Sequence, residues 1–185
     1  MAVSQPDFLP FGLSAHRSPS EIGCQALVEG ALNHTGQYAC AALPDADPLF
    51  DQYIIAYVSG IRVCNVVAVS PYLEDNIEGT ATRQVYAAAA SKMASRLGPP
   101  DQRVDHSSGP IGAEDALFRE GIISQDREVF EQWNHLDKKF QDLDSASLTI
   151  AGDEHFGLAV YSIYRFAHNE ACMRQMELIT GIGSD

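Results

Sequence analysis

Residues 53–69 read YIIAYVSGIRVCNVVAV, and this apolar run indicates the architecture around which the rest of the chain is built. Val, Ile and Tyr suit the pleated surface of a sheet, which predicts strands at Tyr53–Val58 and Ile61–Val69. The Ser-Gly dipeptide between them is typical of a two-residue hairpin turn. Both faces of the second strand are apolar apart from one arginine and one asparagine, so we place this strand in the centre of a sheet.

A helical pattern comes after the two strands. Within residues 80–97, Tyr86, Ala90, Met93 and Leu97 recur at helical spacing, and the alanines between them allow a close approach to a sheet. A glycine and two prolines come directly after Leu97 and end the helix there. The sequence therefore predicts a helix packed on the sheet.

Three more helices are expected. One spans about 19–33, where Ser18 and Glu21 have the spacing of a capping box. Another starts near Asp126, and the last runs from Asn169 to Thr180. We expect the core-facing side chains of these last two helices to be Val129, Trp133, Leu136, Phe140 and Leu143, and then Cys172, Met173, Met176 and Ile179.

A second hairpin completes the predicted sheet. It consists of Ser147–Ala151 and Leu158–Phe166, joined by a polar loop. Consecutive strands that pair as hairpins favour an α+β fold, in which helices pack on an antiparallel sheet built from two hairpins. We expect a single domain over 1–185, and an organisation as two halves, 1–112 and 113–185, that share one sheet also stays open.

Composition limits the classes of partner. Of the 185 residues, 45% are hydrophobic, which is enough for a core, and 25 acidic residues against 12 basic ones give a net charge of -13. This excess of negative charge argues against binding to nucleic acid or to an anionic membrane surface. We therefore expect another protein with a basic surface as the partner, and the oligomeric state stays open.

The sequence also bears on localisation, and through it on the state of the four cysteines. The first 17 residues lack the pattern of a secretory signal, and polar residues interrupt the longest apolar tract, so we expect a cytoplasmic protein without a membrane span. Cys24, Cys40, Cys64 and Cys172 form no CxxC pair. In such a protein we interpret them as buried, unpaired small hydrophobic residues.

Two segments resemble parts of a known group of proteins. FGLSAHRSPSEIG, residues 11–23, and SRLGPPDQRVD, residues 95–105, are similar to the entry into and the exit from a helix in small bacterial α+β modules of the β-lactamase-inhibitor-protein-like kind. The general layout is also similar to that of uncharacterised bacterial proteins. The resemblance implies a sheet surface that binds another protein rather than a catalytic pocket, and it transfers no functional residue.

No local motif indicates catalysis, a cofactor or a metal. The six histidines are dispersed without a metal-binding spacing, and the sequence has neither a GxSxG elbow nor a glycine-rich phosphate loop. We therefore assign no catalytic, cofactor-binding or metal-binding residue. The acidic residues that we expect to contact a partner lie in two polar loops: Glu74, Asp75, Glu78, Asp153 and Glu154.

The sequence thus favours a non-catalytic protein-binding module of bacterial type, such as an inhibitor or an immunity protein that engages a basic partner. Two alternatives stay open. One is an enzyme whose site forms only in three dimensions, with Cys64, Asp105 and His106 as candidates. The other is a structural subunit of a bacterial or phage assembly.

Overall fold

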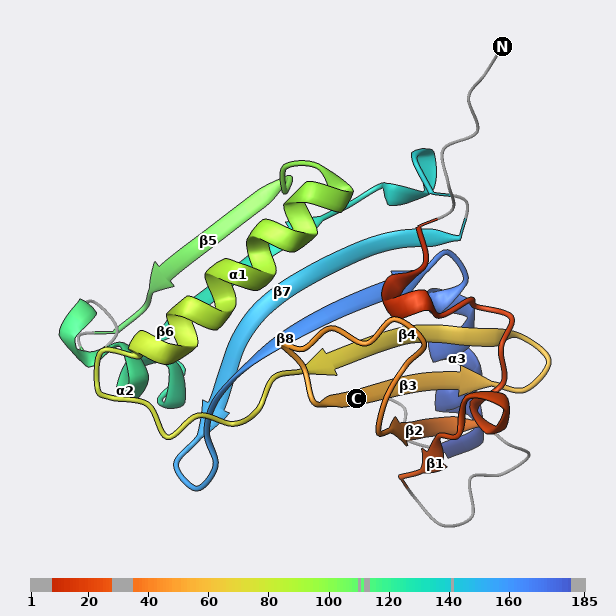
Figure 1. Ribbon diagram of the computed structural model, residues 1–185, viewed down its shortest axis with the longest axis horizontal. Helices are drawn as coiled ribbons and strands as arrows, with labels where there is room; N and C mark the ends of the chain where they lie inside the picture. Colours follow the sequence, from red (N-terminus) through yellow and green to blue (C-terminus); the bar gives the residue numbers. More distant parts are fainter. Residues whose placement is uncertain (1–7, 28–34, 110, 112–113, 141, 181–185) are drawn as a thin grey trace.

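The computed structural model describes residues 8–27, 35–109, 111, 114–140 and 142–180. Within them, eight antiparallel strands form one sheet in the order β1-β2-β3-β4-β8-β7-β6-β5 (Figure 1). The strands are β1 (Gln25–Ala26), β2 (Gly36–Cys40), β3 (Gln52–Val58), β4 (Arg62–Val69), β5 (Gln102–Ser107), β6 (Arg127–Trp133), β7 (Leu143–Asp153) and β8 (Gly157–Phe166). The helices are α1 (Thr80–Leu97), α2 (Phe118–Ile123) and α3 (Asn169–Thr180).

The two predicted hairpins form the centre of the sheet. β3 pairs with β4 and β7 pairs with β8, and the hairpins join where β4 lies beside β8, with Val66 opposite Tyr164. Every pair in the sheet is antiparallel. The expected α+β class, with helices packed on an antiparallel sheet, is therefore confirmed.

The two faces of the sheet are covered differently. Helix α1 crosses the face of β7 and β8, and the segment that contains Phe11 covers the same face farther along (Figure 1). Side chains that point to this face, such as Leu148, Val160 and Tyr164, are buried. Helix α3 packs on β3 and β4 on the opposite face. The main core thus lies between the sheet and α1.

Helix α1 has the predicted bounds because both of its ends are set locally. Gly79 precedes it with a φ of 65°, and Gly98 comes after it with a φ of 95°, conformations that glycine adopts more easily than other residues. The N–H groups of Ala81 and Thr82 in the first turn donate to the carboxylate of Asp75 at 3.1 and 2.7 Å. A loop carboxylate therefore takes the place of a conventional cap.

The helix predicted from Asp126 is wrong, although the residues expected in its core-facing stripe are indeed buried. Val129, Trp133, Leu136, Phe140 and Leu143 are all buried, but the first two lie on β6 and the last begins β7. A spacing of four fits both periodicities, because it returns to the same face of a strand and nearly to the same face of a helix. Pairing with β5 and β7 on both sides selects the strand.

The helix predicted over 19–33 is also wrong in the part that the structure describes. A 3₁₀ turn spans Pro19–Ile22, and the Ser18 N–H donates to the Glu21 carboxylate at 2.7 Å, as in the predicted capping box. Strand β1 comes next and pairs with β2. Residues 28–33 of the prediction lie outside the described residues.

The interpretation of the cysteines as unpaired is wrong too. Cys24 is bonded to Cys40, and Cys64 to Cys172, at sequence separations of 16 and 108. The second disulfide joins α3 to β4. Of the side chains expected to face inward on α3, Cys172 is buried and Met176 packs beside it, whereas Met173 is exposed, because the helix touches the sheet along a narrow stripe. The side chain of Ile179 lies outside the described part.

Among the described residues, no helix is long and apolar enough to cross a membrane.

Candidate functional site

The structure brings together the two loops that hold the predicted partner-binding acids. Leu73 forms a β-bridge with Leu158, so the segment after β4 runs against the β7–β8 hairpin next to its turn (Figure 1). The approach is close, because a Cβ atom added at Gly157 would overlap the carbonyl of Leu73. Glu74 therefore lies beside the hairpin that carries Asp153 and Glu154. Asp75 and Glu78 lie farther along the same segment, toward the start of α1.

Three aromatic side chains lie at this end of the sheet. The rings of Tyr72 and Phe156 are in contact, with centroids 5.7 Å apart, and the hydroxyl groups of Tyr72 and Tyr161 are 2.9 Å apart. Phe156 is 62% exposed and Tyr72 is 39% exposed. Two large exposed rings in contact are unusual, since a lone exposed apolar side chain is ordinary but a cluster more often marks a binding site.

We refer to Tyr72, Glu74, Asp153, Glu154 and Phe156 as the acidic–aromatic surface. The segments that form it, 70–79 and 151–164, contain five acidic residues but neither lysine nor arginine. Neither segment therefore contains a lysine or arginine that could neutralise this negative charge, and His155 is the one histidine in them. The surface combines apolar rings with local negative charge.

Two of the predicted acids also have structural roles. The Asp153 carboxylate accepts hydrogen bonds from the backbone N–H groups of Phe156 and His155, which fix the hairpin turn and lower the pKa of Asp153. Burial raises the pKa of Asp75, but hydrogen bonds from the backbone of Thr82 and Ala81 outweigh it, so the net pKa is lowered. Both carboxylates are thus held in the charged form.

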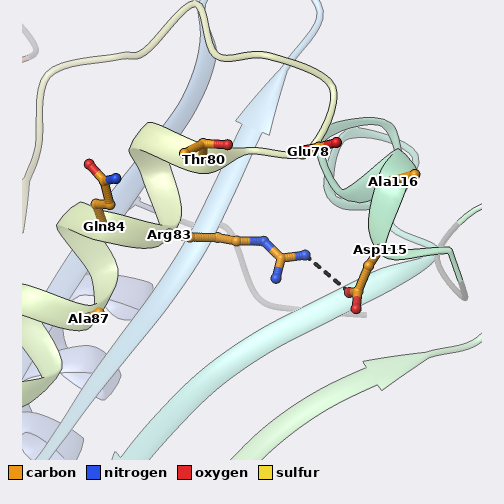
Figure 2. A pocket seen from close by; sticks show the side chains of 7 residues that line it. All are labelled: Glu78, Thr80, Arg83, Gln84, Ala87, Asp115 and Ala116. Atoms are coloured by element: carbon orange, nitrogen blue, oxygen red, sulfur yellow. Dashed lines mark hydrogen bonds and ion pairs between the residues drawn. The ribbon is translucent and has the colours of Figure 1, made fainter.

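Glu78 lies at the end of the same segment, next to the start of α1. It lines a hollow of about 490 Å³ between the start of α1 and the turn before α2 (Figure 2). Arg83 extends across this hollow from α1, and its guanidinium pairs with the Asp115 carboxylate at 3.1 Å. Of the predicted partner-binding acids, Glu78 is the one that lines this hollow.

A network of arginines and carboxylates lies behind this hollow. The buried guanidinium of Arg127 forms a two-pronged contact with Asp105, at 2.7 and 2.8 Å, and another with Asp115 at 2.8 Å. Arg83 and Arg127 both pack on the ring of Phe118, 4.0 and 4.9 Å from its centroid. Hydrogen bonds from Arg127 and Arg83 lower the pKa of Asp115. The network joins α1, β5, β6 and the turn before α2.

A second hollow, of about 470 Å³, lies on the other side of Arg83 between α1 and strands β5 and β6. Tyr86 of α1 and Glu131 of β6 both line it. Burial is the main cause that raises the pKa of Tyr86, and the negative charge of Glu131 adds to it. The Tyr86 hydroxyl therefore stays protonated and can donate a hydrogen bond at ordinary pH.

The residues considered for an enzyme do not converge. Asp105 and His106 lie on β5 at one edge of the sheet, whereas Cys64 lies on β4 in its centre. Cys64 is also buried in a disulfide and has no thiol to react. Among the described residues, no three His, Cys, Asp or Glu side chains are grouped so as to hold a metal ion.

The aromatic half of the surface and the arginine network are not among the residues predicted from the sequence. Tyr72 and Phe156 are far apart in the chain and meet only because of the Leu73–Leu158 bridge. One signal is present: both loops lack lysine and arginine, and each carries an aromatic residue within two positions of an acid. The network around Arg127 gives no such signal, because it depends on β6 being a strand.

Comparisons of the chain with models of protein families, with curated proteins and with solved structures returned no match. The resemblance to the inhibitor-like bacterial modules therefore stays a prediction.

Proposed function

We propose that this protein is a non-catalytic binding module that engages a basic protein partner through the acidic–aromatic surface, in the manner of a bacterial inhibitor or immunity protein. The single observation that carries the proposal is the contact between the exposed rings of Tyr72 and Phe156, beside carboxylates with no lysine or arginine in either segment. Aromatic side chains are preferred anchors of protein interfaces, and such a pair combines apolar area with little rotational freedom.

The charges suit a cationic partner. Asp153 is held ionised by its backbone hydrogen bonds, and Glu74 and Glu154 are exposed on the same end of the sheet. Carboxylates around an aromatic centre accelerate encounter with a basic surface and select against acidic partners. The net charge of -13 favours a protein partner over nucleic acid or an anionic membrane for the same reason.

The compartment is part of the proposal. The sequence favours the cytoplasm, but both disulfides favour an oxidising environment, because the cytosol keeps most thiols reduced. We therefore propose that the protein acts in an oxidising compartment. Free thiols are alkylated in the cells that produce the protein, and the labels on the denatured protein are counted by mass. We expect no alkylated cysteine in an oxidising compartment, and four alkylated cysteines would support the cytoplasm instead.

Affinity capture from the cells that produce the protein tests the docking surface. Wild type, Phe156→Ala and the double variant Glu74→Gln/Glu154→Gln are immobilised in parallel, and bound proteins are eluted with increasing salt. The matched control is Leu178→Ala, which removes an 80% exposed apolar side chain from α3.

The proposal expects one stoichiometric basic partner on wild type and on the Leu178→Ala control. Phe156→Ala loses it, and the double variant releases it at lower salt, because its electrostatic attraction is weaker. Failure to capture a stoichiometric partner, or equal capture by Phe156→Ala, contradicts the proposal.

A further inference from the structure

The hollow between α1, β5 and β6 is lined by both apolar and polar side chains. Phe118, Val129 and Ile150 are among the apolar ones, and Tyr86 lines it from α1. Its volume of about 470 Å³ falls within the range of small-molecule sites, which are mostly apolar with a few polar groups that orient the ligand. This hollow is separate from the acidic–aromatic surface, so a ligand bound in it would be independent of the proposed protein partner.

Two buried polar atoms in its walls have no hydrogen-bond partner among the described residues: Nε of Arg83 and Oε2 of Glu131. The Glu131 side chain is only 11% exposed, and its other oxygen, Oε1, is 3.3 Å from Nε of Arg103. An unpaired buried donor or acceptor is costly, so most such groups in folded proteins are satisfied. One atom is a donor and the other an acceptor, and they come from different elements.

The charges of the lining groups balance. Arg83 and Arg103 contribute two positive charges, and Asp105 and Glu131 contribute two negative ones. A ligand with a net charge would leave that charge uncompensated in a half-enclosed site, which is unfavourable. A zwitterion would avoid this cost, since its anionic end suits the Arg83 guanidinium and its cationic end suits Glu131.

We propose that this hollow binds a small zwitterion with an apolar side group, the chemistry of a hydrophobic α-amino acid. The carboxylate of the ligand accepts from Arg83 Nε, its ammonium donates to Glu131 Oε2, and its side group covers Phe118, Val129 and Ile150. Arg103 contacts the other oxygen of Glu131, Oε1. The Arg103 side chain is 67% exposed on the edge strand β5, so little packing opposes its displacement by a ligand.

Calorimetric titration with L-leucine and L-phenylalanine tests the assignment. Isopentylamine and 4-methylpentanoate serve as analogues that each keep one charged end and the apolar body. The proposal expects saturable binding of at least one amino acid and weaker binding of both analogues. Absence of saturable binding by either amino acid overturns it, as does equal binding of the analogues.

Variants locate the site. Glu131→Gln removes the charged acceptor and should weaken binding about tenfold or more, since a hydrogen bond to a charged group is among the stronger kinds. Glu128→Gln on the same strand is the matched control, because Glu128 is exposed and does not line the hollow, and it should bind like wild type. Unchanged binding by folded Glu131→Gln overturns the proposal.

A second variant keeps the test decisive if Glu131→Gln does not fold. Val104 lines the hollow from the edge strand β5 and is half-buried, so Val104→Trp should fill the space without disturbing the core. The added tryptophan would obscure the fluorescence of the buried Trp133. Amide hydrogen exchange is therefore used to check that the variant is folded. Full binding by folded Val104→Trp places the ligand elsewhere and contradicts the proposal.

Discussion

At the scale of single residues, Asp75 connects the start of α1 to the loop beside the acidic–aromatic surface. Its carboxylate accepts from the N–H groups of Asn76, Ala81 and Thr82, so one side chain orders the loop and the first turn of the helix. These N–H groups at the helix start have no intrahelical partner, and the helix dipole favours a negative charge there. The sequence predicts Asp75 only as a partner contact, and that role stays a prediction.

Substitution of Asp75 by alanine should lower the free energy of unfolding by about 1 kcal/mol at neutral pH, the usual cost of losing a helix cap. The lowered pKa of Asp75 means that this stabilisation is fully present above its ordinary value of 3.8. It is lost as the pH falls through the lowered pKa of the folded state, because the carboxyl becomes protonated there. Urea unfolding of wild type and variant as a function of pH measures the difference.

The exposed Asp144→Asn variant is the control for removal of a carboxylate outside the cap, and its free energy of unfolding should stay close to that of wild type at neutral pH. The capping role would be contradicted if the free energies of unfolding of wild type and Asp75→Ala differed by the same amount at neutral pH and below the lowered pKa of Asp75.

Gly79 is a second residue whose identity the structure explains. It adopts a φ of 65° and lies against the ring of Phe118, where an added Cβ would overlap the ring. Gly79→Ala should therefore cost about 2–4 kcal/mol, from backbone strain together with overpacking. Gly60→Ala is the matched control, since Gly60 has a φ of 81° and no atom within 4 Å of an added Cβ.

Thermal or urea unfolding of both glycine variants gives the comparison. We expect the free energy of unfolding of Gly60→Ala to fall by only about 1–2 kcal/mol, because backbone strain is the only cost there. Equal losses in the two variants would show that Phe118 does not restrict position 79.

At the scale of secondary-structure elements, α3 depends on its disulfide. Its described contacts with the sheet come mainly from Cys172 and Met176, which pack on a small group of residues that includes Ala56 and Val58. Nδ2 of Asn65 also donates a hydrogen bond to Oδ1 of Asn169. Because this cluster is small and separate from the main core, apolar burial alone holds the helix weakly.

Replacement of both Cys64 and Cys172 by alanine should lower the free energy of unfolding by about 3–5 kcal/mol, because the bond closes a loop with a separation of 108 residues. The matched variant Cys24→Ala/Cys40→Ala opens a separation of 16 residues and should cost less, about 3 kcal/mol. Denaturant unfolding measures both losses.

Amide exchange identifies which element responds. In Cys64→Ala/Cys172→Ala, the amide hydrogens of α3 should exchange faster, relative to those of β4, than they do in wild type. Unchanged relative protection of α3 would show that packing, not the disulfide, holds the helix.

Elements with one clear hydrophobic pattern and marked ends are predictable from the sequence. The run over 53–69 and the alanine-rich helix α1 are identified because turn residues and Gly98 mark their ends. Val129 and Trp133 are assigned to a helix because a spacing of four does not distinguish the two periodicities, and only the neighbouring strands do so. The short β1 depends on pairing with β2, which no local pattern reveals.

The candidate site is predictable only in its acidic part. Charged residues in polar loops are visible in the sequence, which is why Glu74 and Glu154 are among the predicted contacts. The contact between Tyr72 and Phe156 depends on a tertiary β-bridge, and the pairing of Cys64 with Cys172 depends on where α3 packs. Interactions of this kind are set by topology, which a single sequence does not specify.

At the scale of the whole molecule, the buried core and the exposed acidic side chains lie in different places. One face of the sheet is filled by α1 and the N-terminal segment, and this core determines the fold. The turn of the β7–β8 hairpin lies at one end of the sheet (Figure 1). Exposed rings and carboxylates lie at this end. The hollow beside α1, with its unpaired Arg83 and Glu131 atoms, lies apart from that end. The two proposed binding regions in the described part of the molecule thus differ in chemistry.

Site-specific photocross-linking tests the central claim most directly. A photoreactive phenylalanine analogue replaces Phe156 in one sample and Leu178 on α3 in another, and both are irradiated in the cells that produce the protein. The account predicts a single adduct with a basic protein from position 156 and none from position 178. An adduct from position 178 alone, or no adduct from position 156, would contradict the docking role of the acidic–aromatic surface.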